Sequence, residues 1–215
     1  YKSEIDGLVQ NFDAISVREK DALDIFDESV ADGISQLGDP VLGVESWDHL
    51  FKPVKGLSRF MFEFAVQPRR SFKDTSQIIS EAMGLESICA DARLNLTRKH
   101  TKSMAFSVGQ WLWSIKNARL VVTNSFHATV FCIIFNTPFV FVPLEGQGEL
   151  PNPRNNRIFD LLDWSGLKSR VWCRDQWGRD RMGFVEMHND EFQLANSAVL
   201  ERRTALTDYL KSKLS

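Results

Sequence analysis

The chain has 215 residues, of which 43% are hydrophobic and 25% are charged. This composition is typical of a soluble globular protein with one sizeable core or two small ones, and it argues against disordered and fibrous classes. Twenty-six basic and 28 acidic side chains give a formal net charge of −2, so we expect no nucleic-acid partner.

The thiols and imidazoles give no sign of a disulfide framework or a metal site. The three cysteines are an odd number and widely spaced, which predicts reduced core thiols: Cys89, Cys132 and Cys173. The histidines are scattered without ligand spacing, so we expect no metal: His49, His100, His127 and His188. No signal peptide is recognisable, and Asn136 and Pro138 interrupt the longest apolar run. We therefore expect a cytoplasmic protein.

Apolar runs alternate with amphipathic stretches along the chain, which predicts an α/β fold of Rossmann-like type with a parallel sheet and helices on both faces. A polar, helix-like segment over 1–12 comes first, without a glycine-rich turn before the first strand. The expected strands are Ala14 to Val17, Arg59 to Ala65, Glu86 to Ala90, Leu120 to Val122 and Phe139 to Val142. The expected helices between them are Glu19 to Asp27, Asp74 to Met83, Val108 to Asn117 and Phe126 to Phe135.

The remaining segments are predicted as loops and two further helices. Leu96 to Ser107 has no periodicity and is expected to be an exposed loop, and Glu145 to Asn156 is expected to form a long loop at the carboxyl edge of the sheet. A short helix over Arg157 to Leu162 and a terminal helix over Phe192 to Leu214 complete the chain. No internal boundary is evident, so residues 1–215 are expected to form one domain.

The strongest site signal is the strand-turn-helix between Arg119 and Pro143. It places His127 in the first helical turn, with Asn124, Ser125 and Thr129 around it. A helix N-terminus has unpaired N–H groups and partial positive charge, so this turn can hold an anion beside a proton donor. The alternative is an ordinary N-cap beside a surface histidine.

Two further segments place cations at carboxyl ends of predicted strands. Arg18 follows the first strand, and Asn156 and Arg157 open the helix after the long loop. Arginine there can bind a phosphate or a carboxylate, although a salt bridge of Arg18 to Glu19 and a surface ion pair are the alternatives. Because parallel strands deliver their following loops to one edge, we expect Arg18, His127 and Arg157 around one cleft.

Four segments resemble, in order and spacing, the polysaccharide pyruvyl transferase family: FDAISVREK, GDPVLGVESW, QWLWSIKNARLVVTNSFHATVFCIIFNTPFVFV and NNRIFDLL. The resemblance runs from about Phe12 to Leu162. It implies one half of a two-domain GT-B type fold, namely the carboxyl-terminal domain, with the amino-terminal domain absent from this chain. We would then expect the lead-in over 1–12 and the helix end over 206–214 to mark the docking face of that domain.

The resemblance also implies roles for single residues. His127 matches the family histidine taken to be catalytic, and Arg18 matches an arginine that resembles a ligand of the donor's phosphate or carboxylate. Ser125 stands where several members have arginine, so one donor contact is absent. Asn156 and Arg157 match a recurring pair, for which substrate binding is implied, as it is for Asn124 and Ser125 in the same turn.

The implied reaction moves a pyruvyl group, often as a ketal, from phosphoenolpyruvate to a sugar of a cell-surface polysaccharide or exopolysaccharide precursor. Phosphoenolpyruvate is the donor substrate, and no cofactor is expected. The expected partners are this donor and a sugar or lipid-linked oligosaccharide acceptor, with peripheral membrane association. One alternative is a GT-B type glycosyltransferase that uses a nucleotide sugar, with Glu145 or Glu149 on the ribose. The other is a non-catalytic carbohydrate-binding module.

Overall fold

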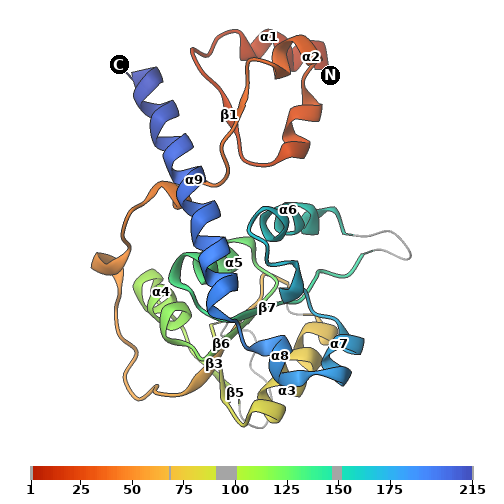
Figure 1. The fold of residues 1–215 in the computed structure, drawn as a ribbon, viewed down its shortest axis with the longest axis vertical. Helices are drawn as coiled ribbons and strands as arrows, with labels where there is room; N and C mark the ends of the chain where they lie inside the picture. The colour runs from red at the N-terminus through yellow and green to blue at the C-terminus, as the bar shows by residue number, and fades with distance from the viewer. Residues whose placement is uncertain (1, 68, 91–100, 147–151, 215) are drawn as a thin grey trace. The chain divides into compact units, whose positions relative to one another are not determined.

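The computed structural model describes residues 2–67, 69–90, 101–146 and 152–214 (Figure 1). The chain divides into two compact units. The larger unit comprises Trp47–Asn196, and the smaller unit combines Tyr1–Ser46 with Ser197–Ser215. This division differs from the single unit expected from the sequence, and each unit is described by itself below.

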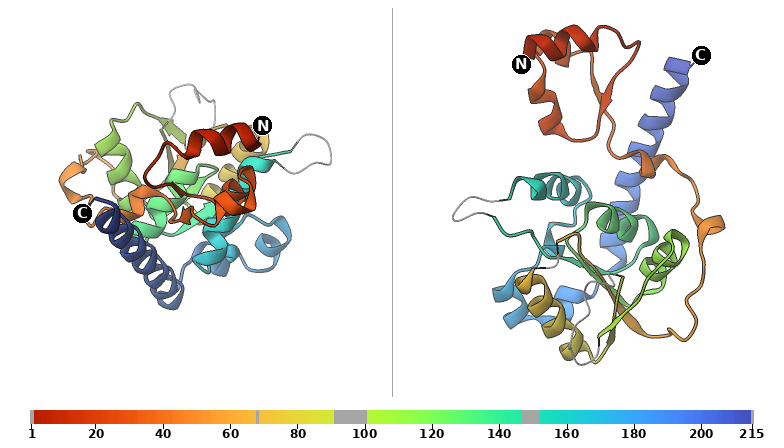
Figure 2. Two further views of the ribbon diagram at one scale, coloured as in Figure 1. Left: turned by 90° about the horizontal axis from the view of Figure 1, so that it is seen from above. Right: turned by 180° about the vertical axis from the view of Figure 1, so that it is seen from behind.

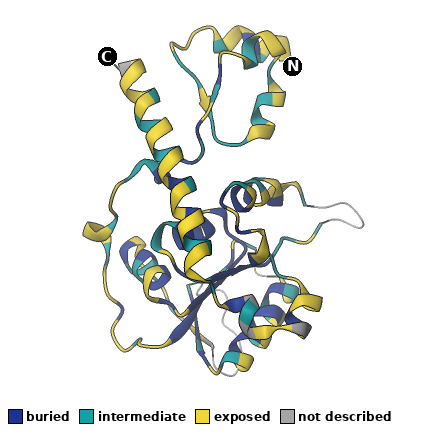
Figure 3. Ribbon diagram, viewed as in Figure 1, coloured by how far each residue is buried: buried dark blue, intermediate teal, exposed yellow. Residues whose placement is uncertain are grey.

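The larger unit is built on a five-stranded parallel sheet in the order β5-β4-β3-β6-β7. Its strands are β3 (Phe60–Phe64), β4 (Glu86–Cys89), β5 (Thr101–Ser103), β6 (Leu120–Thr123) and β7 (Phe139–Phe141). In the register, Met61 of β3 lies opposite Ser87 on one side and Leu120 on the other. The three central strands are almost wholly buried (Figure 3), as expected for a sheet covered on both faces.

Helices connect the strands and cover both faces of this sheet. They are α3 (Arg70–Met83), α4 (Val108–Asn117), α5 (Phe126–Phe135), α6 (Asn156–Trp164), α7 (Arg174–Arg179) and α8 (Arg181–Val185), with short 3-10 turns η3 (Asp48–Leu50), η5 (Pro153–Asn155) and η6 (Lys168–Arg170). The helix α9 (Asn189–Leu214) begins in this unit. Figure 2 shows α4 and α5 on one side of the sheet and α3 on the other. Right-handed crossovers require this arrangement, because β4 and β7 lie on opposite sides of the β3–β6 pair.

The apolar pattern explains how each face is filled. Beneath α3, the side chains of Met61, Leu120, Val122 and Val140 pack against Phe72 and Ile79. On the other face, the ring of Phe131 from α5 meets Trp47 and Trp111 edge-on, with ring centroids 5.0 and 5.6 Å apart. Full burial of such a side chain contributes roughly 1.5–3 kcal/mol, so the two layers fix the sheet and hence its carboxyl edge.

Local sequence sets the helix ends. Gly84 closes α3 in the left-handed conformation at φ 59°, and Asn136 closes α5 in the same way at φ 55°. At the start of α4, Ser107 and Gln110 form a capping box. The helices predicted over Val108–Asn117 and Phe126–Phe135 are confirmed with these bounds, because cap and apolar stripe agree in both.

The smaller unit holds the beginning of the chain and most of the terminal helix. Its elements are α1 (Lys2–Val9), β1 (Ser16–Val17), η1 (Lys20–Ile25), α2 (Glu28–Ala31), β2 (Ser35–Gln36), η2 (Pro40–Gly43) and the part of α9 after Asn196. The strands β1 and β2 form a separate two-stranded parallel sheet. Arg203 of α9 donates to the carbonyls of Leu42 and Val44 at 2.9 and 3.1 Å, which fixes the helix within this unit.

Several sequence expectations need correction. The strand expected at Ala14 to Val17 lies outside the main sheet and shrinks to Ser16–Val17, because it pairs only with β2. The helix expected over Glu19 to Asp27 is the 3-10 turn η1. The expected loop Leu96 to Ser107 includes the edge strand β5, and its residues 96–100 lie outside the described residues.

The thiol prediction holds at two positions. Cys89 and Cys132 are buried and free, and burial raises the pKa of the Cys132 thiol well above its ordinary value. Cys173 is also free but exposed, so it is not a core thiol. It is the N-cap residue of α7 in the larger unit.

Candidate active site

The carboxyl edge of the sheet contains a topological switch point between β3 and β6. From these neighbouring strands the chain leaves toward opposite faces, to α3 after β3 and to α5 after β6. In open α/β sheets such a divergence creates the crevice in which ligands bind. The residues that follow β3, β6 and β7 therefore form the candidate site.

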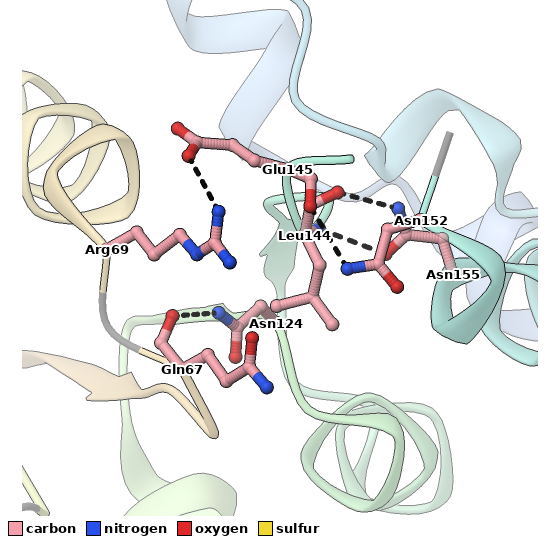
Figure 4. A network of polar contacts seen from close by, with 7 residues as sticks. All are labelled: Gln67, Arg69, Asn124, Leu144, Glu145, Asn152 and Asn155. Carbon is pink, nitrogen blue, oxygen red and sulfur yellow. Dashed lines mark hydrogen bonds and ion pairs between the residues drawn. The ribbon is translucent and has the colours of Figure 1, made fainter. Parts of the chain in front are cut away.

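Asn124 joins the two loops that diverge at this point. Its Oδ1 accepts from the backbone N–H of Val66 at 2.8 Å, and its Nδ2 donates to the carbonyl of Gln67 at 3.0 Å (Figure 4). The hydroxyl of Thr123 adds a bond of 2.6 Å to the carbonyl of Phe64. Asn124 is only 4% exposed, so its observed role is to hold the β3 and β6 loops together. A direct substrate contact of Asn124 stays a prediction.

Ser125 is the N-cap of α5. Its Oγ accepts from the backbone N–H of Ala128 at 3.4 Å, and its carbonyl accepts from the hydroxyl of Thr129 at 2.9 Å. Ser125 is 5% exposed, so the N-cap alternative considered for this residue is confirmed. The polar cluster around His127 is thus satisfied from within and positions the helix end rigidly.

Every residue from Leu120 to Ile133 is buried except His127, which is exposed. It lies in the first turn of α5, where the backbone N–H groups of the helix end face the switch point. Its ring meets that of Phe126 edge-on, with centroids 5.5 Å apart. The sequence prediction of an accessible histidine in a first helical turn is therefore confirmed.

Arg157 reaches the same place from α6. Its guanidinium carbon lies 5.4 Å from the centroid of the Phe126 ring, so Phe126 contacts both Arg157 and His127. The Nε of Arg157 is buried, and no described residue accepts a hydrogen bond from it. The ring of Phe126 thus links Arg157 of α6 to the first turn of α5, and a cleft shared by Arg157 and His127 stays a prediction. Asn156, beside Arg157, is exposed at the start of α6.

Asn155 shapes the loop after β7. Its Oδ1 accepts from the N–H of Leu144 and its Nδ2 donates to the carbonyl of the same residue, both at 2.9 Å (Figure 4). The side chain of Asn152 donates to the carbonyl of Glu145 at 3.0 Å. These bonds fix the backbone that carries Glu145 to the carboxyl edge.

Sequence reasoning missed Arg69, which faces Glu145 across the switch point. Arg69 Nη1 and Glu145 Oε2 lie 3.5 Å apart, and both side chains are about half exposed. A hydrogen bond with the Ser71 hydroxyl, and then the pairing with Arg69, holds the pKa of Glu145 below its ordinary value. Arg69 comes shortly after the predicted strand Arg59 to Ala65, so the rule that identified Arg18 could have found it. Glu149, the other acidic residue considered for a ribose, lies outside the described residues.

Arg18 belongs to the smaller unit and follows β1, not a strand of the main sheet. Its Nε donates to Glu19 at 2.6 Å, and its Nη1 donates to the buried Asp39 at 2.9 Å. Burial opposes the charge of Arg18, but the hydrogen bonds with Glu19 and Asp39 outweigh it and raise its pKa. The ion pair with Glu19, considered as the alternative, is therefore present, and a cleft shared with His127 stays a prediction.

The described residues contain neither a metal-binding cluster nor a membrane-spanning helix. No group of three His, Cys, Asp or Glu side chains there is arranged to hold a metal ion. No helix in the part of the chain that the structure describes has both the length and the apolar character needed to cross a membrane.

Comparison with known structures identifies the fold. The chain is similar to the crystal structure of the glycotransferase of kitacinnamycin, with a TM-score of 0.55 and 13% identity over 92% of this chain. It is also similar to the calicheamicin glycosyltransferase, with a TM-score of 0.50 and 12% identity over 94% of this chain. In each case it covers 52% of the other chain. The expected Rossmann-like α/β fold, resembling one half of a GT-B type structure, is confirmed.

Comparison of sequences identifies the family. No curated protein matches the chain. The family model of polysaccharide pyruvyl transferase matches residues 1–145, which include both loops of the switch point, Arg18, the N-cap Ser125 and His127. On this match, the chain belongs to the polysaccharide pyruvyl transferase family.

Proposed function

We propose that this chain carries the donor-binding and proton-transfer groups of an enzyme that moves a pyruvyl group from phosphoenolpyruvate to a sugar. The observation that carries the proposal is the placement of His127, exposed in the first turn of α5 at the switch point, with Arg157 packed against the neighbouring Phe126 ring. The family match supports a pyruvyl transferase acting on a polysaccharide. The donor and the acceptor precursor are part of the proposal.

The chemistry of the donor requires two kinds of group. Phosphoenolpyruvate has a carboxylate and a phosphate, which cations and helix N-terminal N–H groups bind. Its methylene carbon must gain a proton before an oxygen nucleophile can add at the neighbouring carbon. Histidine titrates near neutral pH and is suited to deliver that proton. In this proposal His127 is the proton donor, and it can be recharged by the proton that an attacking sugar hydroxyl releases.

The proposed reaction is balanced in atoms and protons. Protonation turns the methylene carbon into a methyl group, and the first sugar hydroxyl bonds to the central carbon and loses its proton. A second hydroxyl then displaces the phosphate and closes the ketal. Two hydroxyl protons are released: one replaces the proton given to the methyl carbon, and the other leaves with inorganic phosphate. No electrons are exchanged with any other compound, so the proposed reaction needs no oxidant and no reductant.

The remaining residues are assigned by position and charge. Arg157 is proposed as a cation for one anionic group of the donor, with the N-terminal N–H groups of α5, positioned by Ser125, beside it. Asn156 is exposed next to Arg157 and is proposed to bind substrate, as is Asn124. Arg18, in the smaller unit, is proposed as a further ligand of the donor. The hydrogen bonds of Arg18 with Glu19 and Asp39 hold its guanidinium in a fixed orientation.

The setting of the reaction is also a proposal. The chain spans about half the length of the solved structures it matches, which supports a second, amino-terminal Rossmann-like domain as the partner of this chain in the active enzyme. We propose a cytoplasmic enzyme that acts on a sugar or lipid-linked oligosaccharide, with peripheral association to the membrane that holds such acceptors.

The test is release of inorganic phosphate from phosphoenolpyruvate by the protein that carries this chain, screened against lipid-linked and nitrophenyl sugars. The proposal expects acceptor-dependent phosphate release and a product heavier than the acceptor by one pyruvyl ketal. Transfer from a nucleotide sugar instead would favour the glycosyltransferase alternative. Binding of sugars without turnover of either donor would favour the carbohydrate-binding module.

A further inference from the structure

The guanidinium of Arg69 lies on the β3 side of the switch point and faces Glu145. Arginine has five N–H donors, yet the contact of its Nη1 with Glu145 is the only hydrogen bond from the Arg69 guanidinium to any described residue. At 3.5 Å, and with both side chains about half exposed, this pair is loose and contributes little to stability. The contribution of the Arg69–Glu145 pair to folding stability therefore does not explain its position at the switch point.

The backbone beneath both partners is held in place. The backbone N–H of Arg69 donates to the carbonyl of Gln67 at 2.9 Å, and that carbonyl also accepts from Asn124 at 3.0 Å. On the other side, the two bonds between Asn155 and Leu144 fix the residue before Glu145. Figure 4 shows the side chain of Arg69 extending above Gln67 and Asn124 toward Glu145. A flexible side chain on a fixed backbone can change partner without rearranging the loop.

The carboxylate of Glu145 resembles an anionic ligand in charge and in hydrogen-bond acceptors. It accepts from Arg69, and the Ser71 hydroxyl, at the start of α3, also lowers the pKa of Glu145. Arg69 and Ser71 both lie where β3 leads into α3, so both can serve one carboxylate at the carboxyl edge of the sheet. A carboxylate or phosphate of a substrate has the same charge and the same acceptor geometry.

We propose that Arg69, with Ser71, binds an anionic group of the donor, and that Glu145 is the internal carboxylate which this group displaces. This inference rests on the proposed function for the identity of the donor, phosphoenolpyruvate. It adds a binding residue from β3 to those on α5 and α6, so the donor would be held from both sides of the switch point. Glu145 then lowers the affinity of the empty site and repels the ligand's charge.

The 215-residue chain offers a matched set of variants. Arg69→Gln removes the proposed ligand, and Arg70→Gln makes the same change at the next residue, whose side chain is 95% exposed and pairs with Asp74. Glu145→Gln removes the competing charge and keeps the shape of the side chain. Binding is measured by calorimetry with phosphoenolpyruvate, inorganic phosphate and UDP as separate probes, and tryptophan-fluorescence melts check that every variant is folded.

The expected result is that Arg69→Gln weakens binding of phosphoenolpyruvate about tenfold or more, as loss of a charge-assisted pair requires. Arg70→Gln should bind as the unmodified chain does, and Glu145→Gln should bind more tightly, by about threefold. Equal affinities of Arg69→Gln and Arg70→Gln would overturn the inference, as would absence of binding of all three probes. Arg69-dependent binding of UDP without binding of phosphoenolpyruvate would support the anion site and contradict the proposed donor.

Discussion

Replacement of Asn124 by alanine tests whether the switch point is held together as the structure indicates. Asn124 is 4% exposed and makes two bonds, of 2.8 and 3.0 Å, to the backbone of the β3 loop. Each bond contributes about 1 kcal/mol, and leaving the backbone groups of Val66 and Gln67 without a partner adds a further penalty. The expected loss is about 2–3 kcal/mol, which lowers the melting temperature by about 4–12 °C in a unit of this size.

The measurement can be confined to the unit concerned. All six tryptophans of the chain lie within 47–196, so tryptophan fluorescence during thermal unfolding reports the larger unit alone. Asn117→Ala is the matched control, because Asn117 is exposed at the end of α4 and its side chain bonds to the local carbonyl of Trp113 at 2.8 Å. Its effect should stay within about 0.5 kcal/mol.

A second variant separates the two bonds. Asn124→Asp keeps an acceptor for the N–H of Val66 but places a carboxylate oxygen against the carbonyl of Gln67. At neutral pH it should be at least as destabilising as Asn124→Ala, since a buried charge then faces another acceptor. If Asn124→Ala melts within about 1 °C of Asn117→Ala, the two loops are not held by this side chain and the reasoning is refuted.

Further predictions concern the remaining site residues. His127→Ala should abolish transfer while costing no more than about 1 kcal/mol of stability, because its side chain is exposed; near-normal kcat would remove it from the mechanism. Arg157→Gln should raise KM for phosphoenolpyruvate in steady-state kinetics, and an unchanged KM would exclude Arg157 as a donor ligand. Asn155→Ala should cost about 2 kcal/mol in a tryptophan melt, since two bonds to Leu144 are lost. Arg18→Ala should raise KM more than it lowers kcat, and should speed hydrogen exchange of amides in the smaller unit; unchanged exchange would argue against the buried pair with Asp39.

Local sequence was sufficient to predict most strands and two of the helices of the larger unit. The strands β3, β4, β6 and β7 lie within one residue of the expected ranges, because fully buried parallel strands read as short apolar runs. The helices α4 and α5 have the expected bounds, because caps and apolar stripes coincide. The position of His127 in a first helical turn follows from the same local signals.

Only the tertiary structure decided which strands share a sheet. Ser16–Val17 looks like any other short strand, but its pairing with Ser35–Gln36 places Arg18 outside the main sheet. Conversely, Thr101–Ser103 has no apolar pattern, yet it is a strand because it pairs with β4 at the edge of the sheet. Backbone pairing depends on partners that are distant along the chain, and short strands have too little local preference to reveal them.

The same distinction applies to the candidate site. The sequence by itself determined that Ser125 caps a helix, that His127 is accessible beside it, and that the chain resembles polysaccharide pyruvyl transferases. It could not determine that the amide of Asn124 is bonded to a loop 57 and 58 residues away, or that Arg69 faces Glu145 across 76 residues. Hydrogen bonds and ion pairs of this kind depend on how the crossovers bring loop ends together at one edge of the sheet, and that arrangement exists only in the folded protein.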